Sequence, residues 1–412
     1  MIVQASGANQ ASHYALIRAL DSGTARIDPW QDETADKSFY EGHYYSVKAP
    51  GLAFATLPWY AATDAVGLLG AVREAGEREA REEAVTGRAQ VIREQRTVTW
   101  LLGLWAVVLP ALALLLLVRA GAERVAPGYG TAAAVTLGAA TLVLPYSTML
   151  YAHVPAAALA LGSYLLARRE RMLPAGLLGG LAALVEYPVA LVALVLFVAT
   201  RSLRYAAGAA LGVAPLALYN QWAFGSPFHM SYDDVVGFEG IQEGVFGITL
   251  PDPAVAWDLL LAPKGLLVMT PVVALGVWGL WRLRSWALLA AAAGVFLYDA
   301  AYFSPFGGDV PGPRFLVPIL PFLALGLAVA FRERLALAAA LAAASAVGMV
   351  AATITEPQLV GQDTGRWVDL LGDGDLQFTV LGAAGAGHGW LGIAPFLALV
   401  AAAVALAARS VP

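Results

Sequence analysis

Aromatic, acidic and basic side chains are concentrated near the amino terminus, in the stretch YEGHYYSVKAPG at residues 40–51. Lys48 stands directly before an apolar segment, and His43 and Tyr45 precede it by a few residues. An ammonium group at this boundary can neutralise a phosphate at the level of the lipid headgroups, and aromatic rings can stack on the C–H faces of a sugar. A belt of tyrosine and lysine that anchors the chain at the membrane surface is the alternative.

A second basic candidate is Arg314 in GDVPGPRFLVPIL, because a guanidinium suits bidentate binding of phosphate. Glu186 in ALVEYPVAL is an ionisable group within an apolar region, where such groups usually face a cavity or a partner. Together with Asp309, His43 and Tyr45, Glu186 is a candidate for binding a sugar or an acceptor. The alternatives are a snorkelling anchor for Arg314 and a partly solvated hairpin tip for Glu186.

The amino-terminal region also concentrates carboxylates. Transfer of a sugar to a hydroxyl requires a general base or a cation-bound carboxylate beside the acceptor, and one of these side chains could supply it. They are Asp21, Asp28, Asp32, Glu33, Asp36 and Glu41.

The composition indicates which solvent surrounds these residues. Of the 412 residues, 59% are hydrophobic and 13% are charged, and the mean hydropathy is +0.67. Soluble domains average about a quarter charged residues, so this chain has too few for a surface exposed to water. The continuous apolar runs at 100–118 and 209–224 approach or reach the length of roughly 20 residues that crosses a bilayer. We therefore predict an all-α polytopic membrane protein.

Several chemistries are excluded or left open. The net charge is −5 and no basic cluster is long, which argues against nucleic acid as a partner. The absence of cysteine excludes disulfides, thiolate metal sites and thiol nucleophiles. The five histidines are scattered and indicate no metal site, so the metal remains unknown, although a divalent cation is compatible with the carboxylates.

The apolar runs divide the chain into an external loop at 1–96, with interfacial helices and the candidate site residues, and a multi-span domain at 97–412. Because Pro58, Asp64 and glycines interrupt 51–71, we expect an interfacial or re-entrant helix there. About eleven transmembrane helices are predicted, near 97–118, 129–145, 153–168, 175–187, 188–200, 205–222, 259–281, 286–302, 315–331, 335–355 and 391–408.

Arginines indicate the orientation. They recur at alternate turns, in ARRERM, RSLR, RLR, RER and ARS, and the positive-inside rule places such turns in the cytoplasm. The opposite side receives 1–96 and the loops 223–258, 302–314 and 356–390. We expect a multi-pass plasma-membrane protein whose site faces the extracytoplasmic side.

The stretches NQASHYALIRALDSGTARID and GHYYSVKAPGLAF resemble the first external loop of membrane glycosyltransferases of the C superfamily, such as protein O-mannosyltransferases and lipid A aminoarabinose transferases. YNQWAFGSPFHMSYDD and FGGDVPGPRFLVPILPFLAL also resemble stretches of membrane proteins grouped with them. The resemblance implies a polyprenyl-phosphate-linked sugar as donor and inverting transfer to a hydroxyl of a glycan, lipid or protein. Lys48 would contact the donor phosphate, with Arg314 as a candidate for the same role.

Two departures from the family pattern matter. The acidic pair of these families falls near Asn9 and Gln10, which cannot act as a base. Either Asp28 or Asp36 takes over this role, or the protein is catalytically inactive. We favour Asp36, because only a short loop separates it from Lys48. The family's first transmembrane helix is also missing before residue 1, for which a mis-assigned start codon is our preferred explanation.

Two other functions compete with glycosyl transfer. A transporter or lipid flippase would use Glu186, Asp299 and broken helices to line a pathway. Such a protein should place its polar groups near the bilayer midplane and show internal repeats, whereas no repeat is visible and the polar groups cluster at the outer ends of spans. An inactive glycosyltransferase-like binding protein is the third hypothesis, motivated by Asn9 and Gln10.

Overall fold

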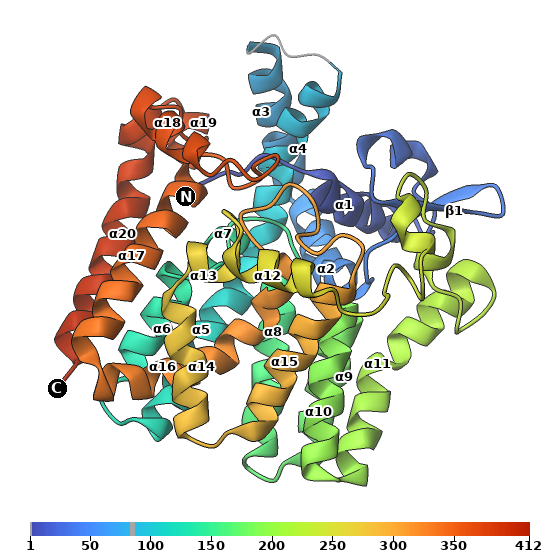
Figure 1. Ribbon diagram of the computed structural model, residues 1–412. Coiled ribbons are helices and arrows are strands. Elements are labelled where there is room, and N and C mark those ends of the chain that lie inside the picture. Colours follow the sequence, from blue (N-terminus) through green and yellow to red (C-terminus); the bar gives the residue numbers. More distant parts are fainter. Residues whose placement is uncertain (1, 83–86) are drawn as a thin grey trace.

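A computed structural model describes residues 2–82 and 87–412, most of which lie in helices (Figure 1). The helices of the lower body run roughly along one direction, and the amino-terminal segment and several loops cover their upper end. The helices are rich in alanine and leucine, which have the most favourable helix propensities. The prediction of a mainly helical protein is confirmed.

The amino-terminal segment contains a β-hairpin that the helical prediction did not include. Strands β1 (Lys37–Tyr40) and β2 (His43–Ser46) pair antiparallel, with Tyr40 opposite His43. Between them, Glu41 and Gly42 both have positive φ, which is the backbone that a two-residue type I′ turn requires. The tight turn sets the register, and the residues before β1 and after β2 therefore meet at the open end of the hairpin.

Four helical elements make up the rest of the amino-terminal segment. The prediction of an interfacial or re-entrant helix at 51–71 corresponds to two helices that meet at 88°, so no straight helix covers this stretch. The elements are α1 (Ala8–Asp21), the 3₁₀ helix η1 (Asp28–Glu33), α2 (Gly51–Ala65) and α3 (Leu68–Glu82).

The body of the protein begins with one long helix that is interrupted by a π-helical turn, η2. The predicted domain boundary at 96/97 falls inside this helix. The elements of the body are α4 (Arg88–Gly103), η2 (Leu104–Val108), α5 (Leu109–Val125), α6 (Gly130–Ala139), α7 (Val143–Tyr146), α8 (His153–Ala167), α9 (Met172–Val185), η3 (Tyr187–Val189), α10 (Ala190–Thr200), α11 (Leu203–Phe224), α14 (Val272–Arg282), α15 (Trp286–Ala301), η6 (Arg314–Ile319), α16 (Leu320–Glu333), α17 (Leu335–Ile354) and α20 (Gly389–Ser410).

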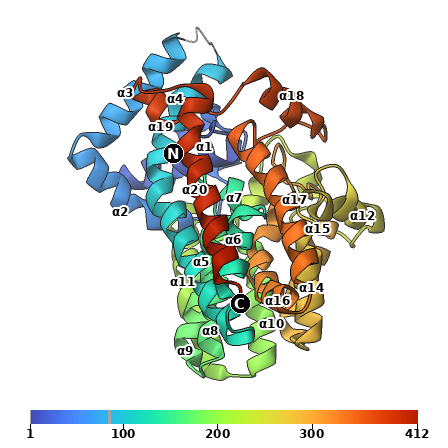
Figure 2. The ribbon, with the colours of Figure 1, turned by 90° about the vertical axis from the view of Figure 1, so that its left-hand side faces the viewer.

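The loops on the upper end contain short helices. Helix α20 then runs down the outside of the body to the carboxyl terminus (Figure 2). The loop elements are η4 (Ser231–Asp234), η5 (Glu239–Gln242), α12 (Pro253–Leu261), α13 (Leu266–Met269), α18 (Gly365–Asp373) and α19 (Val380–Ala383).

Fewer helices meet a criterion of length and hydropathy for crossing a membrane than the eleven spans that the sequence predicts. Among the described residues, four helices are long and apolar enough to cross a membrane, or up to six if each of two bent helix pairs is one span. Five further apolar helices, α6, α8, α9, α10 and α15, are shorter. Helix α6 has 10 residues, or roughly 15 Å, whereas a hydrocarbon core is about 30 Å thick. Hydropathy counts apolar runs but does not reveal how short the helices within them are.

Glycines bring neighbouring helices into close contact. Gly176 and Gly180 on α9 face Gly208 and Gly212 on α11, and a Cβ at Gly176 would collide with the carbonyl oxygen of Tyr205. Small residues four apart allow such close backbone approach between membrane helices. The α9–α11 pair therefore packs tightly and supports the residues at its upper end.

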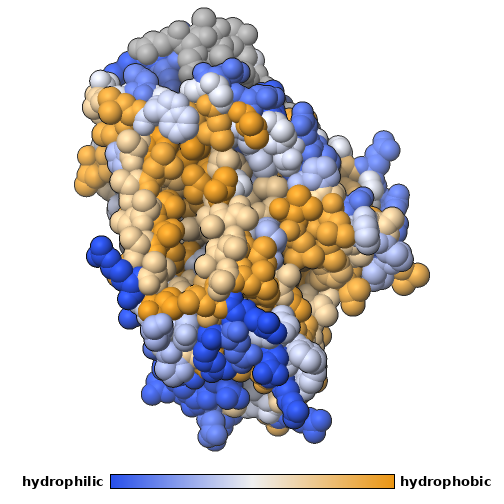
Figure 3. Space-filling model, turned by 60° about the vertical axis from the view of Figure 1, so that its left-hand side comes forward, coloured by the Kyte–Doolittle hydropathy of each residue, from blue (hydrophilic) through white to orange (hydrophobic). Residues whose placement is uncertain are grey.

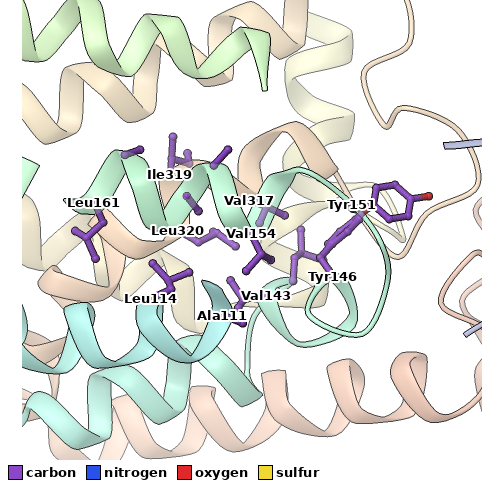
Figure 4. Close-up of a cluster of buried hydrophobic side chains, with 14 of the residues drawn as sticks. Ala111, Leu114, Val143, Tyr146, Tyr151, Val154, Leu161, Val317, Ile319 and Leu320 are labelled. Carbon is purple, nitrogen blue, oxygen red and sulfur yellow. The ribbon is translucent and has the colours of Figure 1, made fainter. Parts of the chain in front are cut away.

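An aliphatic core supports the upper end of the body. Figure 4 shows Leu114, Leu161 and Leu320 packed together, with Tyr146 and Tyr151 at one edge of the cluster. Both tyrosines are buried, and their rings meet edge to face at 5.3 Å. The core thus passes from aliphatic to aromatic residues where α7 leads into α8.

The molecule has two polar ends, which are separated by a hydrophobic band. A band of hydrophobic residues lies between hydrophilic regions in the space-filling view (Figure 3). The arginine-rich turns between α8 and α9, α10 and α11, α14 and α15, and α16 and α17 all lie at the lower end, as does the carboxyl terminus (Figure 1). The amino-terminal segment and the loops 223–258, 302–314 and 356–390 lie at the opposite end. This arrangement is that of a polytopic membrane protein.

Candidate active site

A cavity of about 1430 Å³ opens at the upper end of the body. Its walls come from the start of α1, the open end of the β-hairpin, the α3–α4 pair, and the loops that follow α11, α15 and α17. These segments are distant in sequence, and they include each of the loops predicted to lie on the same side. Asp36, Lys48, Asp309 and Arg314 all line this cavity.

Asp36 and Lys48 form an ion pair, with Lys48 Nζ 2.6 Å from Asp36 Oδ2. The hairpin explains this pairing, because Asp36 directly precedes β1 and Lys48 follows β2 by two residues. The hydroxyl of Ser12 on α1 donates to the carbonyl oxygen of Asp36 at 2.6 Å and lies 2.7 Å from the hydroxyl of Ser46. Helix α1 therefore fixes both ends of the hairpin against each other.

The environment of this pair changes its ionisation. Burial raises the pKa of Asp36, but the charges of Lys48 and Arg314 outweigh burial and hold that pKa below its ordinary value. The pKa of Lys48 is also lowered, by burial and by Arg314, although Asp36 opposes this shift. The carboxylate is thus stabilised in its ionised form by two neighbouring cations.

Arg314 is a buried cation that forms no ion pair with a carboxylate in the described part of the chain. Its side chain is only 8% exposed, and among the described residues no carboxylate lies within ion-pair distance of it. The guanidinium carbon lies 4.9 Å from the centre of the Phe315 ring and 5.8 Å from that of Tyr151. Its Nε has no hydrogen-bond partner in the described part of the chain. A buried cation in this state is suited to receive an anionic ligand.

Glu186 is not among the residues that line the cavity. It follows the last residue of α9, and its Oε2 is 3.1 Å from Nδ1 of His153 at the start of α8. Its charge acts on Lys48, so it belongs to the same electrostatic cluster. Asp309 differs, because it is exposed and lines the cavity.

The structure does not bring Asp28, His43 and Tyr45 into the cavity wall. His43 Nδ1 lies 2.8 Å from Asp28 Oδ2, and the backbone N–H of Tyr44 donates to Asp28 Oδ1 at 2.6 Å. Tyr45 is buried with its ring 4.9 Å from that of Phe224. These residues hold the hairpin to its surroundings, which leaves Asp36 as the carboxylate placed beside Lys48.

Asn9 and Gln10, which stand where C-superfamily glycosyltransferases have an acidic pair, differ from each other in their surroundings. Asn9 lines the cavity, and its buried Oδ1 has no hydrogen-bond partner among the described residues. Gln10 donates to the carbonyl oxygen of Ala5 and accepts from the backbone N–H of Leu150. Gln10 therefore joins α1 to the loop before α8 and is not available to a ligand.

Seven phenylalanine and tyrosine residues that line the cavity were not singled out from the sequence. They come from the loop before α8, the loop after α11, the stretch from the end of α15 into η6, and the loop before α19, and single aromatic residues in such segments give no distinctive pattern. The hairpin did leave a signal, since Glu41-Gly42 separates two runs of strand-forming residues. The seven are Tyr151, Tyr232, Phe238, Tyr302, Phe303, Phe315 and Phe378.

Neither a cluster of metal ligands nor a related protein indicates what the cavity binds. Within residues 2–82 and 87–412, no group of three or more histidine and carboxylate side chains is placed to hold a metal ion. Comparison of the chain with known protein families, curated proteins and solved structures finds no match, so its function must be inferred from the cavity itself.

Proposed function

We propose that this protein is a membrane glycosyltransferase that moves a sugar from a polyprenyl-phosphate donor to a hydroxyl of a glycan, lipid or protein. One observation carries the proposal. The buried guanidinium of Arg314, which has no described carboxylate within ion-pair distance, shares a cavity with the Lys48–Asp36 pair at the polar end of apolar helices. This combination offers an anion site and a carboxylate base where a lipid headgroup can reach them.

The donor is a phosphodiester with one negative charge, and its phosphate would bind Arg314 and Lys48. When the bond between the sugar C1 and the phosphate oxygen breaks, the electron pair goes to that oxygen and the leaving polyprenyl phosphate gains a second negative charge. Two fixed cations in a largely buried site stabilise this developing charge, and such electrostatic stabilisation usually contributes more to the rate than any other single effect.

Asp36 would accept the proton of the acceptor hydroxyl. Its Oδ2 contacts Lys48, and no described group donates a hydrogen bond to its Oδ1, which leaves that oxygen for the acceptor. As the acceptor oxygen forms its bond to C1 from the face opposite the leaving phosphate, its proton passes to the carboxylate. The reaction inverts the configuration at C1.

Donor binding would also tune the base. The cations that hold the pKa of Asp36 low are the ones that a bound phosphate neutralises. The pKa of Asp36 should therefore rise in the donor complex, toward the range in which a carboxylate is an effective base. The free protein keeps the carboxylate ionised, and the donor makes it more basic.

We place the cavity on the extracytoplasmic side of the plasma membrane, because the arginine-rich turns lie at the opposite end. In this proposal the short apolar helices join the long ones in a C-superfamily arrangement of about eleven spans. A transporter is less well supported, because Asp36, Lys48 and Arg314 gather at one end of the helices rather than halfway along them.

The test is transfer of radiolabelled sugar from undecaprenyl-phosphate mannose by the purified protein, with a membrane extract as the source of acceptors. Asp36→Asn should lower kcat at least 100-fold and change KM for the donor little, whereas Asp28→Asn should leave kcat within about threefold, in line with a base worth 10²–10⁴. Unchanged turnover in Asp36→Asn would refute the assigned base.

A further inference from the structure

We infer that the start of helix α1 is an acceptor subsite, which binds a second hydroxyl group of a polyhydroxy acceptor while the reacting hydroxyl lies at Asp36. The inference rests on the proposed function and narrows the class of its acceptor to glycans and lipid-linked sugars. Two polar side chains carry it. They are Ser6, just before α1, and Asn9, in its first turn, and both line the cavity.

Both side chains are buried and have polar atoms without a partner. Ser6 is 2% exposed and Asn9 is 8% exposed. Among the described residues, neither the hydroxyl oxygen of Ser6 nor Oδ1 of Asn9 has a hydrogen-bond partner. Because it is unfavourable to leave a buried polar atom without a hydrogen bond, two such atoms on residues that line one cavity indicate a polar ligand.

The start of α1 adds hydrogen-bond donors to these two side chains. The N-cap residue is Gly7, no side chain caps the helix, and the first turn contains no acidic residue. The first backbone N–H groups of a helix have no partner within the helix, and here they belong to residues next to Asn9. Gly7 and Ala8 also line the cavity. A hydroxyl group can both donate and accept a hydrogen bond, so it matches a site that offers donors and acceptors together.

Hydrogen bonds hold Asp36 alongside this part of α1. The hydroxyl of Thr34 donates to the carbonyl oxygen of Ala8 at 2.7 Å, and the backbone N–H of Asp36 donates to the Thr34 hydroxyl at 3.0 Å. The hydroxyl of Ser12 donates to the carbonyl oxygen of Asp36 at 2.6 Å. Ser12 follows Asn9 by three residues, and residues three apart are neighbours on the surface of a helix. The proposed base and the acceptor subsite are therefore adjacent parts of one cavity.

The segment that contains Ser6 is held in place without a ligand. The carbonyl oxygen of Ala5 accepts hydrogen bonds from the side-chain amides of Gln10 at 2.8 Å and of Gln358 at 2.6 Å. These two amides come from α1 and from the loop after α17. A ligand that binds Ser6 therefore does not have to order this backbone, and such preorganisation favours binding.

A polyhydroxy compound fits the acceptor subsite better than an extended peptide. Extended peptides commonly bind by adding a strand to an exposed sheet edge. Both strands of the hairpin already have bridges on their outer edges, from Ser38 to Val235 and from Tyr45 to Arg26. The unpartnered polar groups are confined to the start of one helix, which suits the closely spaced hydroxyls of a sugar.

Binding of simple glycosides tests the acceptor subsite directly. The full-length protein in nanodiscs is saturated with undecaprenyl phosphate, and equilibrium dialysis compares radiolabelled methyl mannoside, methyl glucoside and methyl galactoside with a peptide that contains serine and threonine. We expect at least one glycoside to bind. Since a neutral hydrogen bond contributes about two- to tenfold in affinity, Ser6→Ala and Asn9→Ala should each weaken binding within that range, and the double variant at least tenfold. Tighter binding of the octyl than of the methyl glycoside would indicate a lipid-linked sugar, and equal binding a glycan.

Controls separate this role from effects on folding and on the donor. Asn9→Ala removes a buried oxygen that has no partner, so the melting temperature should not fall, and binding of undecaprenyl phosphate should stay within about twofold. Gln242→Ala is a control for an exposed amide outside the cavity.

Three results would overturn the inference: unchanged glycoside binding in the double variant, binding of the peptide but of no glycoside, and binding of none of these probes to the parent. Glycoside binding that depends on Ser6 and Asn9, without any sugar transfer, would instead contradict the proposed function and leave the subsite intact.

Discussion

Replacement of Arg314 by methionine distinguishes a role of this residue in binding the donor phosphate from a role in stabilising the protein. The substitution removes a cation that is 8% exposed and has no carboxylate within ion-pair distance in the described part of the chain, so it leaves no carboxylate newly unpaired. Methionine retains an apolar stem against Phe315 and Tyr151. Burial of an ion costs several kcal/mol, and two ring contacts recover about 0.5–2 kcal/mol each. We therefore expect the melting temperature of Arg314→Met to be no lower than that of the parent.

Donor binding should respond in the opposite direction. A hydrogen bond to a charged group is worth about 1.5–3 kcal/mol, and every 1.4 kcal/mol is a factor of ten in affinity. Loss of the guanidinium contact with the phosphate should thus weaken binding of the donor about 10- to 150-fold. Arg314→Lys retains the charge but not the planar pair of donors, and it should fall between the parent and Arg314→Met.

The assay combines thermal unfolding in detergent with competition binding of undecaprenyl phosphate. A lower melting temperature for Arg314→Met, with unchanged affinity for the lipid phosphate, would refute the reasoning. That result would mean that Arg314 is a structural cation whose partners are the surrounding rings. The expected result, weaker binding without loss of stability, is the behaviour of a residue retained for its ligand.

The remaining predictions concern the ion pair. Lys48→Met leaves the carboxylate of Asp36 without its closest partner and should destabilise the protein by about 3 kcal/mol, whereas the double variant Lys48→Met/Asp36→Asn should recover most of this loss. Denaturant unfolding of the parent, the two single variants and the double variant gives the coupling free energy between the two side chains. Additive effects of the two substitutions would contradict the prediction. Activity requires the ionised carboxylate, so it should fall as the pH drops through the pKa of Asp36. Because that pKa is lowered in the free protein, the acid limb of kcat/KM should lie at a lower pH than the acid limb of kcat, which reports the donor complex. Coincident limbs in the two pH profiles would show that the donor does not tune Asp36.

Some of the residues that line the cavity were predicted from the sequence as site candidates, for physical reasons. Lys48 and Arg314 were recognisable because each is a cation at the start of an apolar run on the side that lacks arginine-rich turns. Asp36 was favoured because only a short loop separates it from Lys48 along the chain, and the tight hairpin in that loop brings the two side chains into contact. Asp28 was an equally acidic candidate, and only its contacts with His43 and Tyr44 show that it faces elsewhere.

Composition and hydropathy determined by themselves that this is a helical membrane protein with polar loops at one end. The lengths of the apolar runs and the positions of the arginines between them can be read directly from the linear sequence. The tertiary structure decided which loops meet. It brought Asp36, Lys48 and Arg314 to one cavity, gathered aromatic residues from separate loops around that cavity, and paired Glu186 with His153. These contacts depend on how helices pack in three dimensions, and a linear pattern does not reveal the distance between residues that are hundreds of positions apart.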